Sequence, residues 1–382
     1  MKGNIYRDLY IGELSSELEG KEIRIAGWIE QIRNLGTNLM FLLIRDETGT
    51  VQVICNNPEK FNGVTRESTI TLSGKIVKRT KEMINPNMKT GDIEIELISF
   101  EILGKCAATL PFEINHPENA SEETRLKYRY LDLRNEKHHN TVLFRSKVID
   151  YIRSLMKEMG FTEIATPIIT TSSPEGARDF VIPSRNYKGK FYALPQAPQI
   201  YKQLLMVSGF NKYFQIAPCF RNEAARADRT PGEFYQIDFE MSFATQEDVF
   251  AVAEELATGI YGNFTDMKVC KAPFVRLTWK EAREKYASDK PDLRNPLTVT
   301  TLTDIFKNTN FSVYQGKTIK AIVAPCEGQS RKFFDEMTKF ILDLEGKGLT
   351  WFKFADGALS GSALKFLSED EIAKMTARLN PK

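Results

Sequence analysis

The sequence predicts an α+β protein of several domains, with a small β-barrel first and mixed domains after it. Its 382 residues exceed one ordinary domain of about 100 to 200 residues. Strand-like alternation fills residues 22–103, and helical periodicity follows from residue 141 onwards. The predicted domains are 1–105 (barrel), 106–135 (hinge), 136–285 (second domain) and 286–382 (small α+β module).

Composition narrows the class of protein. The formal net charge is only +2, so nucleic acid would have to bind local basic patches, which argues against a DNA-coating protein. The five cysteines show no CxxC pairing and there are three histidines, which argues against a disulfide framework and a zinc site. The start "MKGNIYRDLYIGEL" lacks a signal-like apolar run, and no stretch reaches the roughly eighteen apolar residues of a membrane span. We therefore expect a reducing, cytoplasmic location without a membrane partner.

Five alternating segments predict the barrel strands. They are "EIRIAGWIE", "NLMFLLIRD", "TVQVICN", "TITLSGKIVK" and "DIEIELISFEIL", with turn signals such as Glu47-Thr48-Gly49 between them. Two interpretations stay open for this domain. It could be a structural β-module, or an OB-fold that binds single-stranded nucleic acid through exposed aromatic and basic positions.

The next segments predict a hinge, a helix and a strand. Residues 106–135 carry prolines and asparagines and then a basic-aromatic run, as in a hinge. Apolar residues at helical spacing predict a helix over 141–160, ending at Gly160. "FTEIATPIIT" reads as extended, and Pro167 within it indicates an edge or interface strand, with plain core packing as the alternative. Further on, residues 246–260 look helical, and short strands alternate with one amphipathic helix over 297–354.

A dense charge cluster surrounds the turn after residue 219. Arg221 and Glu223 lie on or beside a strand, and the turn itself carries Arg226, Asp228 and Arg229. Beyond the turn, residues 234–241 alternate so that one strand face is polar and the other mostly apolar. Such a strand suits the floor of a binding site.

Arginines would have to hold any nucleotide, because neither common glycine-rich phosphate loop occurs in the chain. Arg221 could donate to a phosphate and a carboxylate together and stabilise charge at phosphorus. Glu223 could accept from an exocyclic amine, and Phe234 could stack on a base. The alternative for Arg221 and Glu223 is a surface ion pair of little energetic value.

Two further stretches carry candidate binding residues. "TTSSPEGARDFVIPSR" is a loop with Glu175, and it is either a solvated loop or a lid over a charged substrate. In "FYALPQAPQIYKQLLMVSG", a helix beginning near Pro198 would place Gln199 and Lys202 one turn apart. Together they suit an acidic side chain, although each alone reads as a surface residue.

These stretches together resemble the class II aminoacyl-tRNA synthetases, and within them the bacterial-type aspartyl-tRNA synthetases. The resemblance rests on "SPEGARDF", "LPQAPQIYKQLLMVSGFNKYFQIAPCFRNE", "RADRTPGEFYQIDFEMSF", "RLKYRYLDLRN" and "SDKPDLRNP", and it spans essentially the whole chain. It implies an N-terminal OB-fold, the first half of an antiparallel-sheet catalytic domain, and an inserted α+β module of the GAD type. It also implies a homodimer formed through the helix at 141–160 and Pro167.

The resemblance further implies an aspartate-tRNA ligase that uses ATP and Mg²⁺, with L-aspartate and tRNA(Asp) as substrates and tRNA(Asn) as a second candidate. Arg221 would be the catalytic residue, touching both the aspartate carboxylate and the α-phosphate. The implied aspartate-binding residues are Glu175, Gln199, Lys202, Arg221 and Asp238. Those for ATP are Arg221, Asn222, Glu223 and Phe234, and those for the anticodon are Arg33, Phe41, Gln52 and Glu94.

The sequence also departs from this family. The family's third motif, with its arginine for the γ-phosphate and its magnesium carboxylate, is not found before the final "FLSEDEIAKMTARLNPK". We therefore expect a truncated synthetase with no metal ligand in this chain. Asn222 stands where the family usually has aspartate, and Thr230 where many members have glutamine. Two function classes stay open: the ligase, or a catalytically dead tRNA-binding fragment or remnant of one.

Overall fold

The computed structural model describes residues 3–224, 232–355 and 357–381. These residues form two compact units, Met1–Asp150 and Tyr151–Lys382, which are described separately. The candidates Arg226, Asp228, Arg229 and Thr230 lie outside the described residues.

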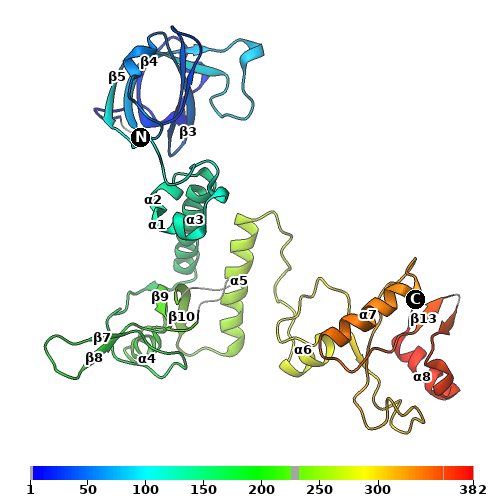
Figure 1. Cartoon of the computed structure of the whole chain (residues 1–382). Helices are drawn as coiled ribbons and strands as arrows, with labels where there is room; N and C mark the ends of the chain where they lie inside the picture. The colour runs from blue at the N-terminus through cyan, green and yellow to red at the C-terminus, as the bar shows by residue number, and fades with distance from the viewer. Residues whose placement is uncertain (1–2, 225–231, 356, 382) are drawn as a thin grey trace. The chain divides into compact units, whose positions relative to one another are not determined.

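The first unit begins with a closed five-stranded barrel in the order β1-β2-β3-β5-β4, drawn in blue to cyan in Figure 1. Its strands are β1 (Glu22–Asn34), β2 (Met40–Asp46), β3 (Gly49–Cys55), β4 (Thr69–Lys78) and β5 (Ile93–Gly104). Alternate residues such as Ile25, Leu42, Val53 and Ile76 fill the interior and are fully buried. The predicted barrel is therefore confirmed, and each predicted segment contains a strand.

Short helical turns and one glycine complete the barrel. The 3₁₀ turns are η1 (Ile11–Glu13), η2 (Ser16–Leu18), η3 (Pro58–Phe61) and η4 (Lys81–Met83). A Cβ on Gly27 would lie 2.3 Å from the carbonyl oxygen of Arg45. Only glycine therefore lets β1 approach β2 this closely.

The segment predicted as a hinge is itself folded. It contains η5 (Pro117–Asn119), α1 (Glu122–Lys127) and α2 (Arg129–Asp132), and its apolar cluster is Phe112, Ile114 and Leu131. Asn115 Nδ2 donates to Glu30 Oε1 at 2.8 Å, which links the segment to the barrel. The division of the chain into four domains at the stated residues stays a prediction.

The predicted long helix is α3 (Glu136–Glu158), which begins before Thr141 because Asn135 caps it. The Asn135 Oδ1 atom accepts from the backbone N–H of Lys137 at 3.1 Å. After Gly160 comes β6 (Thr162–Glu163), an edge strand as predicted, but Pro167 lies beyond it. The strand is shorter than predicted.

The second unit contains a three-stranded sheet in the order β10-β9-β6. Strands β9 (Lys212–Phe220) and β10 (Glu233–Met241) are antiparallel, whereas β6 runs parallel to β9. The other elements near them in sequence are the hairpin β7 (Val181–Pro183) and β8 (Phe191–Ala193), α4 (Gln199–Val207), α5 (Gln246–Phe264) and α6 (Trp279–Tyr286). The helices predicted near Pro198 and at 246–260 are thus confirmed.

The C-terminal part of the second unit mixes short strands and helices, as expected for residues 297–354. Its elements are β11 (Val299–Thr301), β12 (Lys320–Ile322), α7 (Arg331–Asp343), β13 (Lys353–Ala355), β14 (Ala358–Ser360), η6 (Leu364–Phe366) and α8 (Glu369–Leu379). Leu302, Phe306, Leu367 and Met375 form its core. Within the described ranges, no helix combines the length and apolar character needed to cross a bilayer.

Candidate functional site

One face of the β9–β10 pair forms a polar floor. Directly opposed residues of an antiparallel pair point to the same face, so the register defines which side chains share it. The opposed pairs are Phe234 with Cys219, Gln236 with Ala217, Asp238 with Gln215, and Glu240 with Tyr213. We call these eight residues the site floor.

The predicted division of β10 into a polar and an apolar face is confirmed. A surface strand usually buries its apolar face, whereas β10 buries its polar face. The polar face carries Asp238, which is only 8% exposed. On the opposite face Tyr235 and Ile237 are 53% and 38% exposed. The described chain therefore buries the charged side of this strand, which is a costly arrangement unless those charges are paired.

Lys202 on α4 supplies that pairing. Its Nζ lies 2.9 Å from Asp238 Oδ1 and 3.5 Å from Glu240 Oε2, and Gln203 Nε2 donates to Glu240 Oε1 at 2.9 Å. The second oxygen of Asp238, Oδ2, is buried and has no hydrogen-bond partner among the described residues. One ammonium with three donors thus faces two carboxylates, and one carboxylate oxygen remains unused.

The negative charge of Asp238 also affects the pKa of two buried side chains, Tyr213 and Cys219. Burial, followed by the negative charge of Asp238, raises the pKa of the Tyr213 hydroxyl above its ordinary value, so it stays protonated and donates to Gln215 Oε1 at 2.9 Å. Burial, followed by the same carboxylate, raises the pKa of the Cys219 thiol to about 11. A thiol with that pKa remains neutral at physiological pH, so Cys219 is a packing residue and not a nucleophile.

Arg221 follows the last residue of β9 and lies over the site floor. Its guanidinium carbon is 4.9 Å from the centre of the Phe234 ring, and its Nε is buried without a hydrogen-bond partner among the described residues. The Arg221 backbone N–H donates to Gly232 O at 2.7 Å. Gly232 has φ +93°, and a Cβ there would lie 2.9 Å from Arg221 O, so glycine is required at this close approach.

The remaining candidates of this site lie on other segments of the same unit. Glu175 is exposed on its loop, where its carboxylate accepts from Ser173 Oγ at 3.2 Å. Gln199 is half-buried at the start of α4, one turn before Lys202, while Asn222 and Glu223 are exposed after Arg221. The structure therefore brings Lys202 into contact with Asp238 and Arg221 with Phe234.

The barrel presents a second site, a pocket of about 730 Å³. Arg33, Phe41 and Gln52 all line it, and Arg33 is the cross-strand partner of Phe41. Glu94 does not line the pocket but accepts from Gln52 Nε2 at 2.9 Å. Three of the four predicted residues therefore share one pocket, and the fourth orients one of them.

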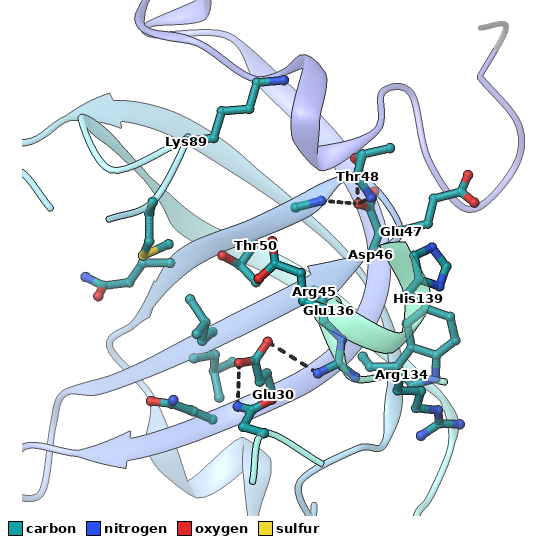
Figure 2. A pocket seen from close by; sticks show the side chains of 18 of the residues that line it. Glu30, Arg45, Asp46, Glu47, Thr48, Thr50, Lys89, Arg134, Glu136 and His139 are labelled. Atoms are coloured by element: carbon teal, nitrogen blue, oxygen red, sulfur yellow. Dashed lines mark hydrogen bonds and ion pairs between the residues drawn. The ribbon is translucent and has the colours of Figure 1, made fainter. Parts of the chain in front are cut away.

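Sequence reasoning missed the charged network in the wall of this pocket. Arg45 bridges Glu30 at 3.3 Å and Glu67 at 2.8 Å, and Arg134 reaches Glu67 at 3.0 Å. Figure 2 shows the Glu30–Arg45 pair with Arg134 and His139 nearby in the pocket. Glu30 and Arg45 are buried strand residues, whereas Glu67 and Arg134 lie outside the strands, so no local pattern marks a network whose partners are far apart along the chain.

The described residues offer no ready-made metal site. Within residues 3–224, 232–355 and 357–381, no group of three or more His, Cys, Asp or Glu side chains is arranged to hold an ion.

The chain thus places a closed five-stranded barrel before a mixed three-stranded sheet whose charged floor lies beside Arg221. Residues 121–348 match the family described as tRNA synthetases class II (D, K and N), and residues 23–103 match the OB-fold nucleic acid binding domain. The chain belongs to this class II tRNA synthetase family, as its sequence motifs predicted.

Individual relatives narrow the comparison. The chain is 48% identical over 381 residues to the aspartate-tRNA ligase of Streptomyces avermitilis, covering 98% of this chain and 65% of that protein. It is 48% identical over 387 residues to the aspartate-tRNA(Asp/Asn) ligase of Rickettsia bellii, covering 98% and 64% respectively. The chain thus spans about 65% of the length of such relatives.

Solved structures agree on the fold. The asparaginyl-tRNA synthetase of Pyrococcus horikoshii, complexed with asparaginyl-adenylate, superposes with a TM-score of 0.60 at 28% identity, covering 68% of this chain and 58% of that chain. A putative aspartyl-tRNA synthetase of Leishmania major gives 0.60 at 25% identity, covering 69% and 54%.

Proposed function

We propose that this protein is an aspartate-tRNA ligase, which joins L-aspartate to ATP and transfers it to the 3′ end of tRNA. The observation that carries the proposal is Lys202 held between Asp238 and Glu240, with Asp238 Oδ2 left without a partner. The free oxygen suits a ligand ammonium, and the remaining donor of Lys202 suits a ligand carboxylate. An acidic amino acid carries both groups.

The first step follows from the position of Arg221. The α-carboxylate of aspartate attacks the α-phosphorus of ATP, an acyl–oxygen–phosphorus linkage forms, and the bond to the β-phosphate breaks to release pyrophosphate. Arg221 can donate to the attacking carboxylate and to the α-phosphate, because its Nε is not engaged by the described protein. Fixed donors of this kind stabilise charge that develops in the transition state.

The second step uses the terminal ribose of tRNA, whose hydroxyl attacks the acyl carbon and releases AMP. No covalent enzyme intermediate is needed, and the neutral Cys219 thiol agrees with that. Mg²⁺ is proposed as a companion of ATP. The described residues form no cluster suited to hold it, so no step is assigned to it.

The other site residues keep the roles that the family resemblance implies. Phe234 and Glu223 would hold adenine, with Asn222 beside them, while Gln199 and Glu175 would contact aspartate. Discrimination against asparagine would come from Lys202, since its ammonium pairs more strongly with a charged carboxylate than with the neutral carbonyl oxygen of an amide.

We propose that the barrel pocket binds the anticodon of tRNA(Asp), with tRNA(Asn) as a second candidate because some relatives are named for both. Phe41 would stack on a base, and Arg33 would donate to the RNA. Because Glu94 engages Gln52 Nε2, Gln52 presents its carbonyl oxygen as an acceptor. This arrangement suits a base edge that carries an N–H donor.

Replacing Phe41 with alanine is expected to weaken tRNA binding about 5- to 150-fold, since stacking on an aromatic side chain contributes about 1–3 kcal/mol per base. Aspartate-dependent pyrophosphate exchange should not change. Filter binding with tRNA(Asp) measures the first effect. The matched control is Tyr6→Ala, which removes an exposed aromatic side chain that precedes the barrel strands and does not line the pocket. Unchanged tRNA affinity in Phe41→Ala would show that the barrel pocket is not the anticodon site.

We also propose a homodimer and a cytoplasmic location. The dimer is supported by α3, the helix that the family resemblance assigns to dimer formation, on which Val142 and Leu143 are exposed. Sedimentation equilibrium of the chain measures the oligomeric state. The location is supported by five cysteines that all remain free thiols.

The proposed substrate is tested by binding of stable adenylate mimics in which a sulfamoyl group replaces the phosphate. We expect the aspartyl mimic to bind at least about 100-fold more tightly than the asparaginyl mimic, as sites built around a substrate group discriminate by such factors. Isothermal titration with both mimics measures the ratio. Equal affinities would remove the basis for aspartate as the substrate.

A further inference from the structure

Gln196 is a buried polar side chain that neither the charge cluster nor the family resemblance singled out. It lies between β8 and α4 and is only 1% exposed. Its Oε1 accepts from the backbone N–H of Ala177 at 3.0 Å, and its Nε2 donates to the carbonyl of the same residue at 2.9 Å. The amide thus pairs with both backbone groups of one loop residue.

The second N–H of the same amide nitrogen bonds another residue of the loop. Gln196 Nε2 donates to Asp179 Oδ1 and lies 3.4 Å from the Ser173 carbonyl oxygen. Asp179 is in turn fixed by Ser172, whose hydroxyl donates to Oδ2. The loop from Ser173 to Asp179, which carries Glu175, therefore folds around a single buried side chain.

Neighbouring backbone bonds tie this loop to the rest of the site. Leu194 N–H donates to Phe180 O, and Phe220 N–H at the end of β9 donates to Pro195 O, both at 2.9 Å. Asn222 N–H donates to Arg178 O at 2.9 Å. Three segments therefore meet at Gln196. They are the loop of Glu175, the segment that leads into α4, and the residue after Arg221.

We propose that Gln196 is a positioning residue that sets the place of Glu175 relative to Lys202 and Arg221, and so sets the affinity for the amino acid. The expected effect on aspartate affinity rests on the proposed function. The anchoring of the loop by Gln196 does not depend on that function. A primary amide suits this position because Ala177 needs an acceptor and a donor at once. A hydrocarbon would leave both Ala177 groups buried and unsatisfied, and a carboxylate would face Asp179.

The test compares Gln196→Met and Gln196→Glu with the unchanged chain. Gln315→Met is the matched control, because Gln315 also donates its amide to a backbone carbonyl, that of Thr309 at 3.0 Å, but lies in the C-terminal part of the second unit. Hydrogen exchange of peptides covering residues 173–180 reports the loop, and peptides from β9 and β10 report whether the sheet has kept its fold. Pyrophosphate exchange gives KM for aspartate and kcat separately.

Both Gln196 variants are expected to speed hydrogen exchange in residues 173–180 at least tenfold, with β9 and β10 unchanged. KM for aspartate should rise about 10- to 100-fold and kcat should fall less than tenfold, because a misplaced loop costs binding more than chemistry. A residue that only supports the fold would loosen the sheet as well or lower kcat without changing KM. Either of those results, or an unchanged loop, would overturn the proposal.

If the protein without any substitution showed no pyrophosphate exchange, that result would count against the proposed function. In that case the loop measurement still decides the anchoring. Faster hydrogen exchange confined to residues 173–180 in both variants would support it, and equal exchange in all chains would overturn it.

Discussion

Replacing Lys202 with methionine is expected to lower kcat/KM of aspartate-dependent pyrophosphate exchange by about 10²- to 10³-fold. Removing one member of a buried, hydrogen-bonded charge group costs about 2–5 kcal/mol, and each 1.4 kcal/mol corresponds to a factor of ten. The substitution deletes the donor for the side-chain carboxylate of aspartate. It also leaves Asp238 and Glu240 facing each other without the cation between them.

The same substitution should lower the melting temperature, because Asp238 stays buried without its partner. Lys280→Met is the matched control, since Lys280 on α6 is exposed and its contact with Glu284 spans 3.9 Å. Thermal unfolding followed by circular dichroism checks the stability, and radioactive pyrophosphate exchange checks the rate. Near-normal exchange in Lys202→Met would mean that aspartate binds elsewhere.

Arg221→Ala should lower kcat of aspartate activation by about 10²- to 10³-fold, the usual effect of removing one preorganised donor at a transition state. The substitution removes the contact of the guanidinium with the Phe234 ring but leaves the backbone hydrogen bond from Arg221 N–H to Gly232 O in place. We therefore expect the fold to survive. The expected pattern is a loss of kcat with an unchanged melting temperature.

The control for this variant is Arg294→Ala, which removes an exposed arginine paired only with neighbouring Asp292 among the described residues. Single-turnover adenylate formation separates the chemical step from substrate binding. If Arg221→Ala kept full activity, the arginine above the floor would be a stacking residue for Phe234 and no more.

The barrel could be predicted from the sequence because its alternation is local. Each strand alternates over seven or more residues, and the interior positions are the β-branched and aliphatic ones. The closure of these strands into a barrel and its β3–β5 parallel contact depend on pairings between distant segments, which periodicity does not specify.

The site floor could be predicted in part. The alternation of β10 identified Asp238 and Phe234, and helical spacing identified Gln199 and Lys202. The register with β9 was not visible, so Tyr213 and Gln215 were missed although they share the same face. Gln196 was missed because one glutamine in "LPQAP" has no periodic partner and its contacts are made with a loop.

The reversed burial of β10 also has a physical cause beyond local pattern. Alternation states which residues share a face, but not which face is covered. Lys202 neutralises the charged face and so allows its burial, while Tyr235 and Ile237 remain exposed in the described chain. The alternation of β10 therefore predicted correctly which residues share each face, but it did not predict which face is buried.

The central claim is that the floor around Lys202 and Arg221 serves to activate aspartate. The most direct measurement is exchange of labelled pyrophosphate into ATP by this 382-residue chain, with aspartate, asparagine or no amino acid present. The account predicts exchange that depends on aspartate, is far weaker with asparagine and falls by about 10²- to 10³-fold in Arg221→Ala. No aspartate-dependent exchange in a folded chain that still binds tRNA would contradict it and favour a tRNA-binding protein.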